Sequence, residues 1–450
     1  MINGPLAGKI LRFAVPLMLS SVLQLLFNAA DVAVVGRFAG KDALAAVGST
    51  AVISHMLVSL GTSFSVGTNI VISRDLGSGN QDNTSCSVHT SVTLALVCGF
   101  LLGSISLLLC RPILVLMRSP ADVIDLSALY LRLYFLGTPA IMLYNFGAAI
   151  LRAQGDTKRP LYFLTSAGII NVCLNLLFVI VFHMSVAGVA LATIASQYIS
   201  AGLVFITLMR EQGPLHLDPK KLRLDKRAVY RILKVGIPAG IQSMIFSVSN
   251  MAGQSAINSL NSTAVMAASS TGDNIAGFVY ISMNAFYQAT QTFASQNYGA
   301  GKCDRVDKVT VLSMLYISTA GLVLGNLAYF FGEELASLYV PGEQEVIELT
   351  VTYLRIVALP YFICGLMEVP VGVMRSIGYY TLPTIVYSTG VCGLRLVWFL
   401  VIFPLMPTPS FLYLAYPVSW AVTAIAQYIL LAILRKRAYR QIQNLQTFSS

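Results

Sequence analysis

The stretch "LQLLFNAADVAVVGRFAG", Leu23 to Gly40, places a carboxylate, Asp31, inside an apolar segment that begins near Leu11. An apolar run of about 20 residues is long enough to cross the hydrocarbon core of a bilayer as one helix. A carboxylate at that depth is costly and is normally paired or functional. The stretch therefore predicts a membrane helix that carries a functional acid.

The composition of the whole chain indicates the same apolar surroundings. Of its 450 residues, 56% are hydrophobic and 11% are charged, and its mean hydropathy is +0.73. A soluble domain carries about 25% charged residues. The net charge of +10 comes from Lys and Arg that fall between the apolar runs, which does not fit a basic patch for nucleic acid. We predict a multi-pass protein of the lipid bilayer with no nucleic-acid partner.

The sequence contains no recognisable motif of an enzyme or a metal centre. Its seven cysteines are scattered without a CxxC pair, and we interpret them as small packing residues. Neither GxxxxGK[ST], nor HExxH, nor GxSxG occurs. We expect no enzymatic activity and no cofactor besides a coupling ion, Na⁺ or H⁺, so that an ion gradient supplies the energy.

Apolar runs of sufficient length predict twelve membrane helices. The expected ranges are 9–35, 44–73, 86–110, 124–151, 160–182, 186–209, 229–258, 263–297, 307–331, 346–374, 383–404 and 411–434. The first run is too long for a signal peptide, and we expect it to remain as the first spanning helix. Basic residues gather in connections such as "REQGPLHLDPKKLRLDKR", whereas the opposite side holds "GEELASLYVPGEQEVIE". We therefore expect an inner (plasma) membrane protein with both termini in the cytoplasm.

The second half of the chain repeats the first. A shift of 222 residues places Pro16 on Pro238 and Asn28 on Asn250, and a shift of 223 later places Pro160 on Pro383. The repeat predicts an all-α fold with an N-terminal six-helix lobe (1–209), a cytoplasmic linker (210–228), a C-terminal six-helix lobe (229–434) and a cytoplasmic tail (435–450). An even number of helices in each lobe implies a pseudo-two-fold axis along the membrane normal, the plan of alternating-access transporters.

Asp31 has oxygen-bearing candidates for partners. Asn171 and Asn175, in "NVCLNLLF", are four residues apart and so share one face of the fifth predicted helix, and Thr193 on the sixth can add a hydroxyl. Such a group can hold a hard cation through oxygen ligands or take up a proton. Two other interpretations stay open. Asp31 can face the interface near its helix end, and the Asn pair can join helices by hydrogen bonds.

Several motifs resemble the multidrug and toxic compound extrusion family over essentially the whole chain. They are "LFNAADVAVVGRFAGKDALAAVG", "ILRAQGDTKRP", "NVCLNLLF", "TFASQNYGAGKCDRV" and "VGVMRSIG". The resemblance implies a twelve-helix exporter that uses a Na⁺ or H⁺ gradient to expel bulky, often cationic amphiphiles. It also implies that Asp31 is the ion-binding acid of the first helix and that Pro16 matches a proline able to bend that helix.

The chain departs from one branch of the family on the fifth helix. That branch has Asn followed by Asp, whereas this chain has Asn171 followed by Asn175, so one carboxylate is missing. Both Na⁺ and H⁺ remain open as the coupling ion. We predict Asp31, Asn171, Asn175 and Thr193 as ion-coupling residues, with Asp31 a ligand if the ion is Na⁺, and Pro16 as a conformational residue.

The substrate site is expected in the second half. Glu368 on the tenth helix can attract a cationic substrate or a second ion, or it can pair with an Arg such as Arg395. The eighth helix carries "GFVYISMNAFYQATQTF", which suits a pocket for flat cations, although packing and lipid contact are the commoner roles of such residues. The predicted substrate-binding residues are Glu368, Asp273, Phe278, Met283, Phe286 and Tyr287.

Two rival functions are weighed against export of organic cations. A lipid-linked oligosaccharide flippase of the same superfamily would need basic groups in its cavity, whereas the mid-span positions here include two acids and few cations. A membrane-embedded lipid-modifying enzyme would need clustered His, Asp or Ser, and the four histidines lie on separate segments. We expect a monomer whose partners are small organic cations, the coupling ion and the bilayer.

Overall fold

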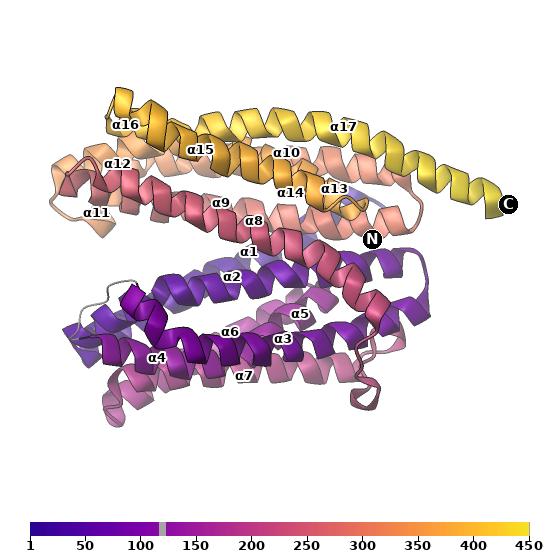
Figure 1. Cartoon of the computed structure of the whole chain (residues 1–450), viewed down its shortest axis with the longest axis horizontal. Helices are drawn as coiled ribbons and strands as arrows, with labels where there is room; N and C mark the ends of the chain where they lie inside the picture. The colour runs from indigo at the N-terminus through magenta and orange to yellow at the C-terminus, as the bar shows by residue number, and fades with distance from the viewer. Residues whose placement is uncertain (117–122, 450) are drawn as a thin grey trace. The chain divides into compact units, whose positions relative to one another are not determined.

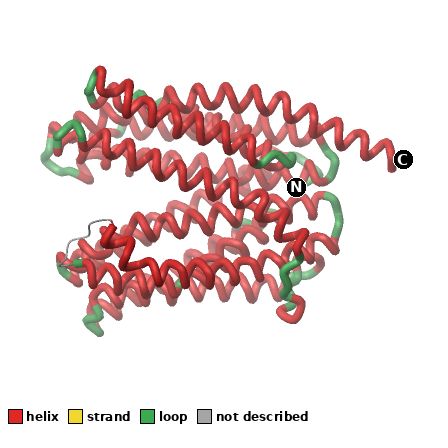
Figure 2. The backbone as a smooth tube through the Cα atoms, in the orientation of Figure 1, coloured by secondary structure: helices red, strands yellow, loops and turns green. Residues whose placement is uncertain are grey.

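The computed structural model describes residues 1–116 and 123–449, and this part of the chain is helical without a strand (Figure 2). The helices of the first half, with the π-helical (η1, η2) and 3₁₀ (η3, η4) segments, are α1 (Leu6–Val34), η1 (Val35–Ala39), α2 (Lys41–Gly77), α3 (Gln81–Leu116), α4 (Ile124–Leu136), α5 (Thr138–Gln154), α6 (Lys158–Leu176), η2 (Leu177–Val181), α7 (Ser185–Arg210), η3 (Gly213–Leu215) and η4 (Pro219–Lys221). The helices of the second half are α8 (Lys226–Asn258), α9 (Thr263–Gly299), α10 (Cys303–Phe330), α11 (Gly332–Tyr339), α12 (Gln344–Val357), α13 (Tyr361–Ser376), α14 (Thr381–Tyr387), η5 (Ser388–Gly393), α15 (Leu394–Val397), η6 (Trp398–Ile402), η7 (Phe403–Leu405), α16 (Pro409–Tyr413) and α17 (Ala415–Ser449).

The described residues contain nine helices that are long and apolar enough to cross a membrane, or up to eleven with two bent pairs. The pairs are α4 with α5, bent by 44°, and α12 with α13, bent by 40°. The sequence predicts one helix for each pair, at 124–151 and 346–374. Gly137 at the first bend and Pro360 at the second explain the break, since neither residue supports a continuous helix. With the more polar α9, these segments confirm the all-α polytopic fold of twelve spanning helices in two lobes.

Contacts divide the chain into two compact units. Unit 1 comprises Met1–Met18 and Ile241–Ser450, and unit 2 comprises Leu19–Gly240. The division falls at different points from the predicted lobe boundaries, because the first turns of α1 pack with the second half and the first turns of α8 pack with the first half. Phe13, for example, packs edge-to-face on Phe293 at 5.6 Å in unit 1.

A proline precedes each of these crossings by two residues. Pro16 lies inside α1, which leaves unit 1 after Met18, and Pro238 lies inside α8, which leaves unit 2 after Gly240. Proline removes one helical hydrogen bond and so makes bending easier at that point. Each half of the repeat therefore has a proline that makes its first helix easier to bend close to the point where that helix passes from one unit to the other.

In each unit one helix of the bent pair packs against three long helices, which Figure 1 labels. In unit 2, α5 packs against α2, α3 and α7, and in unit 1 its counterpart α13 packs against α9, α10 and α17. Large apolar side chains such as Leu108 and Leu400 remain 79% and 72% exposed, as expected for helices whose solvent is lipid.

The predicted linker 210–228 is anchored rather than loose. Leu215 and Leu217 are buried, and the Asp218 N–H donates to His89 Nε2 on α3 at 3.0 Å. Asp225 begins α8 by accepting the Ala228 N–H at 2.9 Å, and this bond holds the pKa of its carboxyl below the ordinary value. Residues 210–240 therefore act as part of unit 2.

The predicted tail at 435–450 begins within a helix, because α17 continues to Ser449. Arg435 forms an ion pair with Asp307 at 3.0 Å, and the Tyr439 hydroxyl donates to the same carboxylate at 2.9 Å. These contacts hold the part of α17 around Arg435 and Tyr439 against α10, which an apolarity criterion alone does not predict.

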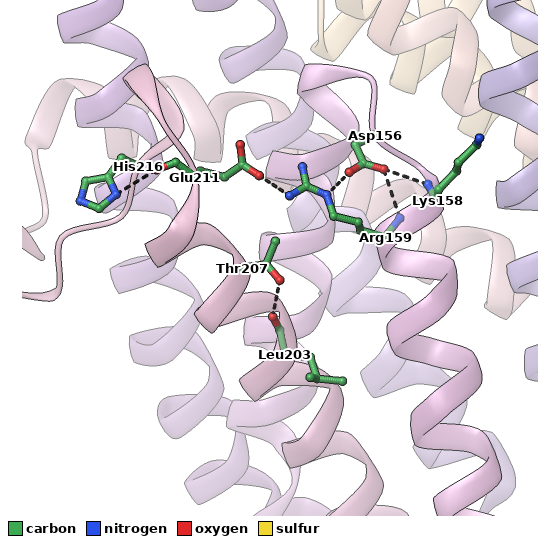
Figure 3. A network of polar contacts seen from close by, with 7 residues as sticks. All are labelled: Asp156, Lys158, Arg159, Leu203, Thr207, Glu211 and His216. Atoms are coloured by element: carbon green, nitrogen blue, oxygen red, sulfur yellow. Dashed lines mark hydrogen bonds and ion pairs between the residues drawn. The ribbon is translucent and has the colours of Figure 1, made fainter.

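A polar network joins the start of α6 to the end of α7 in unit 2 (Figure 3). Asp156 Oδ1 accepts the backbone N–H groups of Lys158 and Arg159 at 3.0 and 3.1 Å, so Asp156 caps α6. The Arg159 guanidinium contacts both Asp156 and Glu211. This network holds the C-terminal end of α7, where the linker begins, against the start of α6. Its role is structural.

Candidate functional site

Asp31 lies in a small polar pocket between α1, α6 and α7 of unit 2. The lining residues are Gln24, Phe27, Asn28, Asp31, Leu164, Ala167, Gly168, Asn171, Thr193, Ser196, Gln197 and Ser200. The pocket holds about 60 Å³, which is room for an ion or a few waters. A drug-sized ligand needs about 300 Å³ or more, so this pocket is of ionic size.

The three predicted partners of Asp31 form one hydrogen-bonded network with it, and two of them, Asn171 and Thr193, line this pocket. Asn175 Nδ2 donates to the Asp31 carboxylate and also lies 3.4 Å from Asn171 Oδ1. Asn171 Nδ2 in turn donates to Thr193 Oγ1 at 3.4 Å, and Thr193 donates to the Val189 carbonyl at 3.0 Å. The structure thus places all four predicted ion-coupling residues in one connected network.

One oxygen of this network is left without a partner. Asn175 is fully buried, and within the described residues its Oδ1 accepts no hydrogen bond. Buried acceptors in proteins are almost always satisfied, so this oxygen marks a polar site that the surrounding side chains do not complete. The pocket lining contains no Lys, Arg or His. A carboxylate, amide oxygens and a hydroxyl are the donor set of a hard cation, and the carboxylate alone can take a proton.

A glycine sets the width of the pocket. A Cβ atom placed on Gly168 of α6 would lie 2.0 Å from the Phe27 ring of α1. The missing side chain therefore lets α1 approach α6 closely, one turn before Asp31. Any larger residue at Gly168 must push α1 away from Asn171 and Asn175.

The pocket contains more polar residues than the sequence analysis named. Gln24 and Asn28 extend the face of α1 that carries Asp31, and Ser196, Gln197 and Ser200 extend the face of α7 that carries Thr193. The signal was present in the spacing, because positions 193, 196, 197 and 200 follow the i, i+3, i+4, i+7 pattern of one helix face. A polar face on a membrane helix indicates a cavity or a partner.

Glu368 is buried on α13 in unit 1, and its surroundings differ from the expected pairing. Tyr280 is its hydrogen-bonding neighbour and Arg375 is the cation that acts on it, not Arg395. Arg375 donates to Gln242 Oε1 at 2.7 Å and to the Tyr287 hydroxyl at 3.1 Å. Sequence reasoning missed Arg375, although it lies seven residues after Glu368 and so shares its helix face.

The remaining predicted substrate residues do not converge on one surface. The Asp273 carboxylate accepts the Tyr353 hydroxyl, whereas Phe278 is exposed. Met283 and Phe286 lie in the apolar core of unit 1, where Phe286 packs on Tyr316 at 5.8 Å. Of these α9 residues, Tyr287 is linked to Glu368 through Arg375. Met283 and Phe286 have a packing role.

Known proteins resemble the chain over most of its length. A family model named MatE matches residues 16–177 and 238–400. "Probable multidrug resistance protein YoeA" of Bacillus subtilis (strain 168) is 30% identical over 390 residues, which cover 85% of this chain and 84% of that protein. An "FAD transporter" of Shewanella oneidensis is 25% identical over 449 residues, which cover 96% and 95%.

Solved structures share the fold. The structure described as "Crystal structure of MATE in complex with MaL6" superimposes with a TM-score of 0.90 at 18% identity and covers 98% of both chains. The two matched blocks of the family model, 16–177 and 238–400, begin at the two prolines that the repeat pairs.

Proposed function

The chain belongs to the MatE family of membrane transporters, and we propose that it is a cation-coupled antiporter that exports amphiphilic organic cations by alternating access. Its relatives include multidrug resistance proteins, which support drug export and small-molecule substrates. A transporter of this family moves its substrate without changing it. The coupling ion, the substrate charge, the monomeric state and the cytoplasmic placement of both termini are our proposals.

The pocket at Asp31 carries the proposed coupling. The decisive observation is a pocket of ionic size, lined by Asp31, Asn171 and Thr193 without a basic residue. Beside it, Asn175 bonds the Asp31 carboxylate through Nδ2 and keeps an unsatisfied Oδ1. An ion or proton bound there interacts with α1, α6 and α7 together and alters the repulsion between unpaired oxygens. A ligand shifts a two-state equilibrium by its differential affinity for the two states, and Pro16 gives α1 a place to bend in response.

Glu368 supports the proposal of cationic substrates. Its carboxyl group, when ionised, places a negative charge on α13, the central helix of unit 1, with Tyr280 and Tyr287 near it. Aromatic faces and a carboxylate together favour a flat cation. Arg375 offsets part of this charge, so we assign Glu368 to the substrate and Asp31 to the coupling ion.

A second candidate is export of aromatic anions. The relative named as an FAD transporter spans almost the whole chain, and the buried Arg375 could attract a phosphate as readily as Glu368 attracts a cation. Counterflow of a cationic dye against flavin nucleotides in the same vesicles separates the two candidates.

The proposal is tested by dye export from proteoliposomes under separately imposed Na⁺ and pH gradients. Asp31→Asn keeps the size of the side chain and removes the charge, so we expect folding and dye binding to persist while gradient-driven export is lost. Asp42→Asn, at an exposed acid in the first turn of α2, is the matched control. Export by Asp31→Asn at the wild-type rate, with unchanged ion dependence, would refute coupling at Asp31.

A further inference from the structure

The face that forms the Asp31 pocket in unit 2 has a counterpart in unit 1. The 222-residue shift places Gln24 on Phe246 and Asp31 on Gly253, and the 223-residue shift places Thr193 on Tyr416, Ser196 on Ser419 and Gln197 on Trp420. Ser196 and Ser419 are buried in both units. The counterpart also keeps Asn250 in place of Asn28 and Thr423 in place of Ser200, and it carries aromatic residues in place of Gln24, Thr193 and Gln197.

The π-helical segment η5 (Ser388–Gly393) extends the shift to 224 residues for the helix that follows α14. A π segment holds one residue more than the α-helix it replaces. The burial pattern supports the longer shift. Its buried pairs are Ala167 with Val391, Gly168 with Cys392, Asn171 with Arg395, Asn175 with Phe399, and Val179 with Phe403. Arg395 thus occupies the place that Asn171 occupies in the Asp31 pocket.

The contacts of the two faces agree with this pairing. Asn175 reaches Asp31 in unit 2. In unit 1, a Cβ on Gly253 would lie 3.3 Å from both the Phe399 ring and the Tyr416 hydroxyl. The counterparts of Asn175 and Thr193 therefore fill the space in which Asp31 stands in the first half.

Arg395 is enclosed by aromatic rings. Its side chain is 2% exposed, and its guanidinium carbon lies 4.5 Å from the ring centre of Tyr416 and 5.8 Å from those of Trp420 and Phe246. Arg395 Nε donates to Ser419 Oγ at 3.0 Å. Several aromatic faces around one cation form the kind of cage that proteins use to bind ammonium and guanidinium ligands.

The acidic side chain that interacts with this cage is that of Asp273. Asp273 acts electrostatically on Arg395, while its carboxylate accepts the Tyr353 hydroxyl. Among the described residues, no carboxylate forms an ion pair with Arg395 in the cage. A cage of rings with a carboxylate at longer range is a complete site for a small organic cation, and here the side chain of the protein occupies it.

We propose that the Arg395 guanidinium is a built-in cation of unit 1. Because it belongs to the protein chain, it permanently occupies the place that corresponds to the proposed ion site at Asp31 in unit 2. Unit 1 therefore takes no coupling ion at this place, and the ion dependence of transport comes from the Asp31 pocket. The consequence for transport rests on the proposed function. The existence of the cage depends only on the contacts of Arg395.

The cage is tested by chemical rescue of Arg395→Ala, measured as thermal unfolding in detergent. Methylguanidinium chloride is compared with methylurea, which has a similar shape and no charge. We expect the wild-type midpoint to respond equally to both compounds at millimolar concentration. The Arg395→Ala midpoint should fall and then rise by about 2 °C or more with methylguanidinium alone. Equal rescue by both compounds, or none, would overturn the proposal.

Arg435→Ala is the matched control, because Arg435 is half exposed and pairs with Asp307. It should show no rescue by methylguanidinium. If Arg395→Ala does not fold, Arg395→Lys and Arg395→Gln replace it in proteoliposomes. The Lys variant should keep at least half of the export rate, and the Gln variant should lose most of it and regain it with methylguanidinium. Equal behaviour of the Lys and Gln variants would overturn the proposal.

The ion dependence of Asp31→Asn separates the two hypotheses. Loss of all Na⁺ and H⁺ dependence in Asp31→Asn, with cation rescue in Arg395→Ala, supports both. Unchanged ion dependence in Asp31→Asn refutes the proposed coupling, and rescue of Arg395→Ala would then still establish the cage. Ion dependence that persists in Asp31→Asn and is lost in Asp273→Asn would contradict the built-in cation.

Discussion

The Asp31 pocket of unit 2 and the Arg395 cage of unit 1 stand at equivalent places of a repeated fold and have opposite contents. The first is a carboxylate among amides and hydroxyls with an unsatisfied oxygen. The second is a guanidinium among three aromatic rings. The backbone plan is shared, so the difference lies in a few side chains that face one another from three helices.

This comparison shows how one half of a symmetric transporter can respond to an ion that the other half ignores. A buried charge needs a partner or a ligand, because its desolvation is costly. Unit 1 meets this need from within its own sequence, whereas unit 2 leaves room for an ion from solution. Coupling to a gradient therefore requires an incomplete site in one unit only.

The largest expected effect comes from closing the pocket. Gly168→Ala places a Cβ within 2.0 Å of the Phe27 ring and should destabilise the protein by about 3 kcal/mol through overpacking. At the equivalent place unit 1 already carries a buried side chain, Cys392. Cys392→Ala should therefore cost less than about 1.5 kcal/mol.

Thermal unfolding and ion-driven export of both variants provide the measurement. Replacing Phe27 by Leu in the Gly168→Ala background should restore stability and part of the export. If Gly168→Ala is as stable as Cys392→Ala, the close approach of α1 to α6 does not set the pocket.

The next effect concerns the unsatisfied oxygen. Asn175→Leu removes both the amide that bonds Asp31 and its free Oδ1, so the apparent affinity for the coupling ion should fall by about tenfold, or about 1.4 kcal/mol. Phe399→Leu, the equivalent change in unit 1, should leave that affinity unchanged. The affinity is read from export rate against ion concentration. An equal shift in both variants would contradict the asymmetry between the units.

A smaller effect on stability is expected at the start of the second helix of each half, α2 and α9. Ser262 caps α9 by accepting the Val265 N–H at 3.2 Å, whereas its counterpart before α2 is Gly40, which has no side chain. Ser262→Ala should lower stability by about 1 kcal/mol. Gly40, with φ of +90°, should instead resist any substitution for backbone reasons. Thermal unfolding of Ser262→Ala and Gly40→Ala checks both, and an unchanged Ser262→Ala would exclude a capping role.

The sequence predicted much of this fold because apolar length and the repeat are strong signals in a membrane protein. Asp31, Asn171, Asn175 and Thr193 could be grouped because polar groups are rare at that depth and the Asn pair shares a helix face. The unit boundary could not be predicted, because the crossing of α1 and α8 depends on packing such as that of Phe13 rather than on hydropathy.

The Arg395 cage was beyond the sequence for a different reason. The π segment η5 adds one residue, so the 222- and 223-residue shifts that the sequence reveals do not place Arg395 on Asn171. The sequence favours Arg395 as a partner of Glu368, since both are ionisable and lie on adjacent predicted helices. The structure turns it instead toward Tyr416 and Trp420.

The smallest expected effect concerns the charge of the substrate. Here the acidic residue is in unit 1, whereas the acid of the Asp31 pocket is in unit 2. Glu368 falls on Asn145 under the 223-residue shift, so at this pair unit 1 has an ionisable side chain and unit 2 has a neutral one. Asn145 is satisfied locally, because its Nδ2 donates to the Ile141 carbonyl at 2.8 Å and its Oδ1 accepts from Thr62 at 3.3 Å. Glu368 acts on a substrate through its field, which Arg375 partly offsets. We therefore expect Glu368→Gln to slow export of a cationic dye about threefold, or about 0.7 kcal/mol, relative to a neutral dye. Asn145→Leu should change both dyes alike. Equal losses of the two dyes in Glu368→Gln would remove Glu368 from substrate recognition and leave it a structural role beside Tyr280.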